Sequence, residues 1–153
     1  MEIRPATPAD APAMSAMLEA LIAAGKRTNP GDLDFTMTHY VTHPDGTLCS
    51  VAVDDDGSIL GLQSLSRAVE GNRYGTPVGW GIIGTHVAPA AARRGVGSRL
   101  FEVSREAARA AGIGKIEAYI AVRNVEGQAY YEAMGFRTYR IDGEAICKRY
   151  RVV

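Results

Sequence analysis

The sequence predicts an α/β fold, a mixed sheet with helices packed against it. Strand-like and helix-like segments follow one another in the order strand, two helices, three strands, helix, strand, helix, two strands. Turn signals between neighbouring strands predict antiparallel hairpins at the start and finish, and two helices in the second half predict crossover connections. Because no repeat or low-complexity tract interrupts this order, we expect one domain over residues 1–153.

The N-terminal segments predict one strand and two helices. Ile3–Ala6 has the pattern of a short strand, and Thr7-Pro8 starts a helix that continues to about Ala24 with an apolar face. Polar residues, glycine and proline predict a loop over Gly25–Asp34. Phe35–Val41 then predicts a second, shorter helix.

The middle of the chain predicts three strands. Leu48–Val53 and Ile59–Val69 flank an aspartate-rich stretch that ends in Asp56-Gly57-Ser58, a turn signal that joins them into a hairpin. A turn-rich connection over Gly71–Pro77 leads into Gly79–Val87, the predicted central strand.

The C-terminal segments predict two helices and three strands. Gly97–Ala111 carries apolar side chains on one face and charged side chains on the other, as expected of a helix packed on a sheet. The elements predicted after it are a strand at Ile116–Val122, a helix at Val125–Met134, a strand at Phe136–Tyr139, a tight turn at Ile141–Glu144 and a strand at Ala145–Val152.

The link between the central strand and the next helix predicts an anion-binding site. Gly95 and Gly97 allow a tight backbone and a close approach of a ligand, and the first amides of a helix lack partners within it. Arg93, Arg94 and Arg99 add positive charge at the same point. These features favour a bound pyrophosphate. The loop lacks the lysine of a nucleoside triphosphatase loop and the third glycine of a dinucleotide-binding fingerprint, which argues against both classes.

A second segment has the signals of a sharply bounded helix. Asn124 is a favourable N-cap, and Gly135 stands where a helix ends in a left-handed residue. Tyr130 and Tyr131 lie near the end of this helix on different faces. The two caps explain the helix, but they do not require a tyrosine at position 131.

In this order and spacing, the two segments resemble the GNAT superfamily of N-acetyltransferases, most closely over residues 79–137. The family's cofactor loop, Gln/Arg-x-x-Gly-x-Gly/Ala, is similar to Ala92-Arg93-Arg94-Gly95-Val96-Gly97, and Val87-Ala88-Pro89 matches the Val-x-Pro that closes its central strand. Its later pattern, Asn-x-x-Ala-x-x-x-Tyr-x-x-x-Gly-Phe, matches at Asn124, Tyr131, Gly135 and Phe136. Ala92 and Gly127 depart from these patterns, and Gly127 weakens its helix by roughly 1 kcal/mol relative to alanine.

The resemblance implies a GNAT-like fold, a central mixed sheet of about six to seven strands flanked by about four helices, whose central strands splay apart to hold the cofactor. It also implies acetyl-CoA as the acetyl donor. The residues expected to contact acetyl-CoA are Thr85, His86, Val87, Arg93, Arg94, Gly95, Val96, Gly97, Ser98, Arg99, Asn124 and Tyr131.

The implied reaction is direct attack of a primary amine on the thioester, and it needs three groups. The Val87 amide is the candidate donor to the carbonyl oxygen, and Tyr131 is the candidate acid for the leaving thiolate, in preference to a purely structural tyrosine. His86 has the intrinsic pKa of a base. A water chain to Glu117 or Glu132 would serve equally well.

We expect the acceptor to be a small primary amine, an amino acid or analogue first among them. Its recognition is assigned to the segment Lys26–His43, with Trp80 and Tyr139 nearby. Asp32 and Asp34 are the candidates to hold the ammonium, and Phe35, Tyr40 and Trp80 are the candidates to enclose an apolar side chain; Asp34, Phe35 and Trp80 are the residues proposed first. Three alternatives stay open: an acyl-CoA-binding module without catalysis, a protein or peptide N-acetyltransferase, and an α/β domain that serves only as a structural or partner-binding unit.

Composition limits the classes of partner and cofactor that we expect. Basic and acidic residues balance at 17 each, so no overall charge favours nucleic acid or an anionic membrane. The three histidines and two cysteines have no metal-ligand spacing, so we expect no metal. The chain shows no targeting segment, which favours the cytoplasm, and a homodimer stays open.

Overall fold

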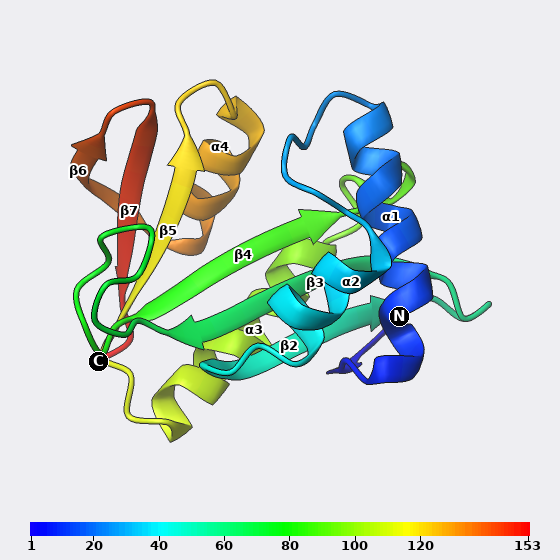
Figure 1. The fold of residues 1–153 in the computed structure, drawn as a ribbon, viewed down its shortest axis with the longest axis horizontal. Coiled ribbons are helices and arrows are strands. Elements are labelled where there is room, and N and C mark those ends of the chain that lie inside the picture. The colour runs from blue at the N-terminus through cyan, green and yellow to red at the C-terminus, as the bar shows by residue number, and fades with distance from the viewer.

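The computed structural model describes residues 1–153 and confirms the predicted α/β class, a seven-stranded mixed sheet with helices on both faces (Figure 1). The strand order is β1-β2-β3-β4-β5-β7-β6, with β4 and β5 parallel and every other neighbouring pair antiparallel. The strands are β1 (Glu2–Pro5), β2 (Gly46–Val53), β3 (Ile59–Arg67), β4 (Gly81–Val87), β5 (Lys115–Ala121), β6 (Arg137–Asp142) and β7 (Ala145–Arg151).

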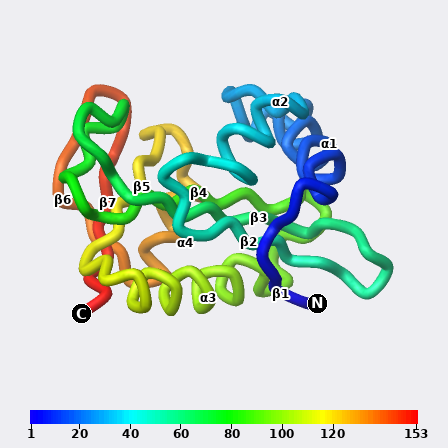
Figure 2. The backbone as a smooth tube through the Cα atoms, turned by 60° about the horizontal axis from the view of Figure 1, so that its bottom comes forward, coloured from blue at the N-terminus to red at the C-terminus, as the bar shows by residue number.

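The helices form two layers. Figure 2 shows α1 and α2 on one face of the sheet and α3 on the other, where α4 joins it through the bond from the Tyr130 hydroxyl to the Gly97 carbonyl. The helices are α1 (Ala11–Ala23), α2 (Leu33–Thr36) with a π-helical continuation over Met37–Val41, α3 (Val96–Ala110) and α4 (Val125–Met134), with short 3₁₀ turns at Pro8–Asp10 and Pro89–Ala91. No helix is long and apolar enough to cross a membrane.

Several predicted boundaries differ from the structure by a few residues, and two of these differences have a clear local reason. The helix predicted to start at Phe35 starts at Leu33, because the Asp32 carboxylate caps it by accepting a hydrogen bond from the Phe35 N–H at 3.2 Å. The strand predicted to end at Tyr139 continues to Asp142, which pairs with Ala145 across a tighter turn than expected.

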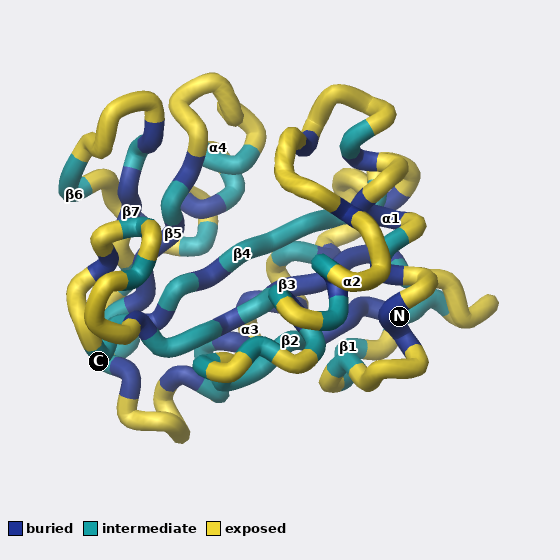
Figure 3. Tube along the Cα trace, viewed as in Figure 1, coloured by how far each residue is buried: buried dark blue, intermediate teal, exposed yellow.

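Apolar packing fastens both helix layers to the sheet. Phe101 of α3, Tyr131 of α4 and Phe136 share one buried cluster with residues of β4 and β5. Met14 and Leu18 of α1 are buried against β2 and β3 on the opposite face. In Figure 3 the buried stretches follow the strands, and the loops at the sheet ends are exposed.

The β4–β5 pair separates after three residue pairs. The register runs from Gly81↔Ile116 to Ile83↔Ala118 and stops, whereas β4 stays paired with β3 as far as Val87, and β5 stays paired with β7 as far as Ala121. The two strands therefore diverge into an open gap, visible in Figure 1. This confirms the predicted splaying of the central strands.

The backbone groups that face this gap follow from the β3–β4 register. The Ala88 N–H donates to the Leu60 carbonyl at 2.8 Å, and in an antiparallel pair such bonds recur at every second residue. Gly84 and His86 therefore bond to β3, and the N–H and C=O groups of Thr85 and Val87 point away from it, toward the gap.

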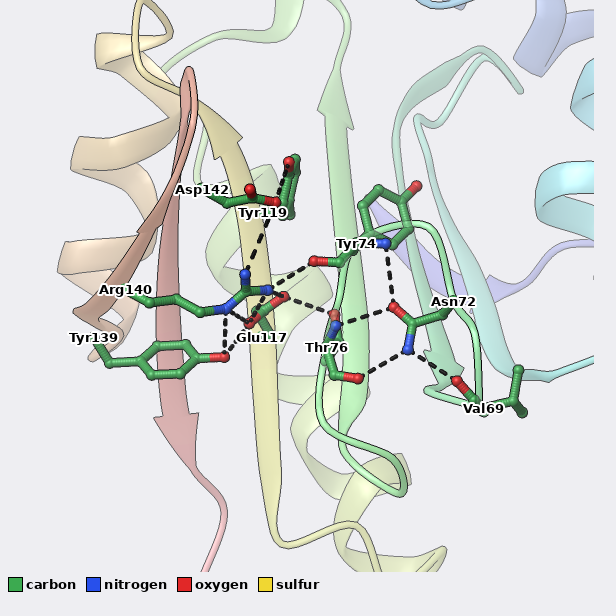
Figure 4. A network of polar contacts seen from close by, with 9 residues as sticks. All are labelled: Val69, Asn72, Tyr74, Thr76, Glu117, Tyr119, Tyr139, Arg140 and Asp142. Carbon is green, nitrogen blue, oxygen red and sulfur yellow. Dashed lines mark hydrogen bonds and ion pairs between the residues drawn. The ribbon is translucent and has the colours of Figure 1, made fainter.

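A buried ion-pair network supports the β5–β7 side of the gap (Figure 4). The Glu117 side chain on β5 is fully buried and accepts bonds from Arg140 Nη2 at 3.0 Å and Thr76 Oγ1 at 2.6 Å, and from the Tyr139 hydroxyl. A bulge in β6 between Thr138 and Arg140 allows the adjacent residues Tyr139 and Arg140 both to reach the Glu117 carboxylate. Arg140 Nη2 also donates to the Tyr74 carbonyl at 2.8 Å, so the network ties the β3–β4 connection to β5 and β6.

We expect Arg140→Met to lower the free energy of unfolding by about 3 kcal/mol, because it leaves the buried Glu117 carboxylate without its cation. Arg137→Met on the same strand is the matched control, since its exposed guanidinium pairs with an exposed carboxylate, and should cost less than about 1 kcal/mol. Urea unfolding measures both. Equal losses in the two variants would contradict a supporting role for the network.

Candidate active site

The loop before α3 presents unpaired backbone amides. Arg93 has a φ of 66° and Gly95 a φ of 74°, so the chain turns sharply into the helix at Val96. The N–H groups of residues 95–98 have no acceptor within the protein. With the partial positive charge of the helix N-terminus, they form the anion site expected from the sequence.

Of the three arginines expected around this site, two bond to neighbouring segments of the protein and one does not. Arg94 pairs with Asp54 of the β2–β3 hairpin at 3.3 Å, and Arg99 Nη1 donates to the Met1 carbonyl at 3.0 Å. Both therefore fasten the loop and the helix to neighbouring segments. Arg93 is exposed and forms no ion pair, so its side chain is free to meet an anion.

Gly97 is required by a close contact with α4. A Cβ atom at this position would lie 2.5 Å from Cε1 of Tyr130, which is closer than side chains approach each other. The Tyr130 hydroxyl donates to the Gly97 carbonyl at 2.8 Å. The two motifs recognised in the sequence thus touch, and the ring of Tyr130 helps to fix the anion site.

Side chains on the α3–α4 face of the sheet form a polar chain beneath the gap. Gln63 Nε2 donates to Thr85 Oγ1 at 2.9 Å and to the Tyr130 hydroxyl at 3.0 Å. Thr85 Oγ1 lies 2.8 Å from the Tyr131 hydroxyl. Thr85 Oγ1 accepts from Gln63, and one proton is shared between the Thr85 and Tyr131 hydroxyls, since either can donate to the other.

Tyr131 is held in its protonated form. Burial raises the pKa of Tyr131 well above the ordinary value, and the hydrogen bond with Thr85 offsets only part of that rise. At neutral pH the phenol is therefore protonated, a state that can supply a proton but cannot take one up as a base.

His86 projects from the other face of β4, and its Nε2 atom already has hydrogen-bond partners within the protein. Arg27 Nη1 donates to Nε2 at 3.2 Å, and the Tyr40 hydroxyl lies 3.2 Å from the same atom. Burial, with the charge of Arg27 next, lowers the pKa of His86 to about 3. The structure therefore argues against the predicted role of His86 as the base and makes it a partner of Arg27.

The two carboxylates considered for a water-linked base are also engaged. Glu117 is enclosed in the Arg140 network, and Glu132 lies 3.3 Å from Arg137 and 3.7 Å from Lys148. Asn124 Oδ1 accepts from the Gly127 N–H at 2.9 Å, so this side chain caps α4 as predicted.

A cleft of about 630 Å³ lies on the α1–α2 face of the sheet and reaches the gap. Ser64, Gly84 and His86 contribute to its floor. One wall, here called the helix-side wall, consists of His39, Tyr40 and His43. The opposite wall, here called the hairpin-side wall, consists of Tyr119, Asp142 and Glu144. Arg73 and Tyr74 of the β3–β4 connection also line the cleft.

Of the residues predicted to bind the acceptor, Tyr40 lines this cleft, and Asp34, Phe35 and Trp80 do not. Asp34 is exposed on α2, and Phe35 packs against the α1 core and stacks on His39 with ring centroids 4.6 Å apart. Trp80 precedes β4 and packs against Tyr139, with ring centroids 5.5 Å apart and the ring planes tilted by 41°. The segment Lys26–His43 does border the cleft, and its lining residues are Thr28, Asn29, His39, Tyr40, Val41 and His43.

Several cleft residues were missed by sequence reasoning. His39 lies in the helical stretch that ends at Val41 and His43 lies just after it, and their ring centroids are 5.9 Å apart. Arg73, Tyr119 and Asp142 lie on segments that only the sheet topology brings together. Gln63 gave no signal except its place in a strand.

We expect Gly97→Ala to weaken acetyl-CoA binding and to lower stability, because the added methyl displaces Tyr130 and the first turn of α3. Helix propensity alone predicts the opposite sign, a gain of about 1 kcal/mol. Calorimetry and thermal unfolding measure the two effects. The double variant Gly97→Ala with Tyr130→Ala removes the contact and should recover much of the affinity; a stabilised single variant with unchanged affinity would contradict this account of the loop.

Comparison with known proteins agrees with this geometry. The acetyltransferase (GNAT) family model matches residues 14–136, and no curated protein matches the chain. A GCN5-related N-acetyltransferase from Kribbella flavida has a TM-score of 0.80 at 21% identity, over 98% of this chain and 96% of its own. The protein yncA from Salmonella typhimurium, solved with its cofactor acetyl-CoA, has a TM-score of 0.75 at 20% identity, over 99% and 94%.

The ribosomal-protein-alanine N-acetyltransferase from Brucella melitensis has a TM-score of 0.77 at 21% identity, over 99% of both chains. At these identities the solved structures establish the fold, and the family model, which covers most of the chain, establishes the family. The chain therefore belongs to the GNAT family of acetyltransferases and is an acetyl-transferring enzyme.

Proposed function

We propose that this enzyme transfers the acetyl group of acetyl-CoA to the primary amine of a small molecule. The observation that carries the proposal is the gap between β4 and β5. It has unpaired amides at the α3 N-terminus, the Tyr131 hydroxyl beneath it and a charged cleft above it. Acetyl-CoA and the acceptor amine would thus approach the gap from different sides.

The residues around the gap fit acetyl-CoA. The amides of residues 95–98 and the free Arg93 side chain suit its pyrophosphate. The backbone groups of Thr85 and Val87 suit the amides of its pantetheine arm, which would pair with β4 as an added strand does. When bound, acetyl-CoA supplies an activated acetyl thioester.

Two groups of the chain would lower the barrier to transfer. The Val87 N–H, directed into the gap, donates to the carbonyl oxygen as negative charge develops there. Tyr131 holds the proton that the leaving thiolate needs. A cysteine-like thiol has a pKa about 8.5, so a protonated phenol is a weak but suitably placed donor.

The acceptor amine would enter along the hairpin-side wall. Asp142 and Glu144 supply negative charge there, which attracts an ammonium group. Asp142 is held by a 2.9 Å hydrogen bond from the Tyr119 hydroxyl. This wall lies beside β5 and therefore beside the gap, where the amine must lose a proton before it attacks.

A thiol-release assay over a panel of amino acids, polyamines and peptides, with acetyl-CoA binding measured in parallel, tests the proposal. We expect tight acetyl-CoA binding and turnover of one or more small amines. Binding without turnover of any amine would favour the non-catalytic module, and turnover confined to a folded protein would favour a protein substrate.

We expect Tyr131→Phe to bind acetyl-CoA as the parent does and to lower kcat about 100- to 10,000-fold, because only the proton donor is removed. Tyr150→Phe is a matched control, since this hydroxyl lies in the same aromatic cluster and makes no hydrogen bond. Steady-state kinetics at saturating acetyl-CoA give both values. If kcat is unchanged while chemistry limits the rate, Tyr131 has a packing role only.

We expect Thr85→Val to lower kcat about tenfold and Thr85→Ser to retain most of it, because only the serine keeps the hydroxyl that orients Tyr131. Thr85→Val introduced into the Tyr131→Phe variant should lower kcat no further. An equal loss in both backgrounds would show that Thr85 acts independently of Tyr131.

A further inference from the structure

Arg27 is a buried cation without a counterion. Its side chain is only 8% exposed, yet no carboxylate lies within ion-pair distance of it. Nη1 donates to His86 at 3.2 Å, Nη2 donates to the Pro30 carbonyl at 2.7 Å, and Nε is buried with no partner. Burial of a charge is unfavourable unless an opposite charge accompanies it. Both of the cleft residues that it touches, His86 and Tyr40, face the site.

More positive charge surrounds the same wall of the cleft. Arg73 is exposed, stacks over Tyr74 at 5.1 Å and forms no ion pair. Burial lowers the pKa of His39, and the charges of His43, Arg73 and Arg27 lower it further. Asp45 borders an adjoining hollow, but it pairs with neither arginine.

The charges of the cleft are therefore divided between its walls. Arg73 lines the cleft beside His39 and His43 of the helix-side wall, and Arg27 lies behind His86 and Tyr40, outside the lining. On the hairpin-side wall Glu144 forms no ion pair, and Asp142 lies 3.9 Å from Arg140. A ligand with one positive and one negative group fits this division in one orientation only. Its amine faces the gap, and its anionic group faces Arg27 and Arg73.

We propose that the acceptor carries a carboxylate, bound at the helix-side wall by Arg73 with the buried charge of Arg27 behind it, so that the acceptor is an amino acid rather than a simple amine or polyamine. The inference rests on the proposed function, because it names the acceptor class for the same cleft. A carboxylate would supply the negative charge that Arg27 lacks and would form charge-assisted hydrogen bonds with a guanidinium.

The test uses matched sets that differ in one group. Alanine, leucine and phenylalanine are compared with ethylamine, isopentylamine and phenethylamine, which lack the carboxylate. For the side-chain size that the cleft prefers, we expect kcat/KM to be about 10- to 100-fold higher for the amino acid, the range of a lost charge-assisted hydrogen bond. Amines that match or exceed their amino acids would overturn the proposal.

The two arginines are then changed one at a time. Arg27→Gln and Arg73→Ala should each reduce the ratio of kcat/KM between amino acid and amine about tenfold. Arg151→Ala, an exposed arginine at the end of β7 without an ion pair, is the control and should keep the parent ratio. Arg73 is exposed, so its variant stays informative if Arg27→Gln fails to fold. A parent-like ratio in Arg73→Ala and in folded Arg27→Gln would overturn the proposal.

A binding measurement separates this inference from the proposed function. Propanoate, isocaproate and hydrocinnamate keep the carboxylate and lack the amine, and calorimetry records their binding to the enzyme saturated with CoA. If no amine is acetylated, the proposed function fails, and carboxylate binding that is lost in Arg73→Ala would still support the anion site. Absence of carboxylate binding to the parent would overturn it.

Discussion

The end of β4–β5 pairing at Ile83 and Ala118 is the constraint on which the rest of the structure depends. β4 cannot follow β5 because it remains bonded to β3, and β5 remains bonded to β7. The strand edge left between them exposes backbone groups of Thr85 and Val87. Backbone polar groups in a protein interior need partners. A ligand that offers amides of its own satisfies them, which explains why a broken sheet suits a cofactor with an amide-containing arm.

The alternation of side chains along β4 divides the site into two halves. Thr85 points to the α3–α4 face, where Gln63 and Tyr131 complete a chain of hydrogen bonds. His86 points to the opposite face, where it meets Arg27 and borders the cleft. In the proposed function, proton donation therefore takes place on one face of the sheet and acceptor recognition on the other. The Glu117 network holds the β5–β7 side in place, so that the gap between the halves keeps its width.

The sequence was sufficient for features that depend on short segments. The element order, the α4 caps and the loop before α3 are encoded by local signals such as Asn124, Gly95 and Gly135, and the structure agrees with them. The acceptor cleft was not predictable in this way. Its charged residues come from positions as distant as Arg27, Arg73 and Asp142, and only the sheet topology unites them. The interpretation of His86 as a base failed for the same reason, because Arg27, which occupies its nitrogen, is 59 positions away in the sequence.

Amide hydrogen exchange, measured residue by residue by NMR, tests the role of the gap most directly. The account predicts slow exchange at Gly84 and His86, which bond to β3, with and without acetyl-CoA. At Thr85 and Val87 it predicts fast exchange in the free enzyme and slow exchange once acetyl-CoA is added. Protection of Thr85 and Val87 in the free enzyme, or exchange at these two residues that acetyl-CoA leaves unchanged, would contradict the account.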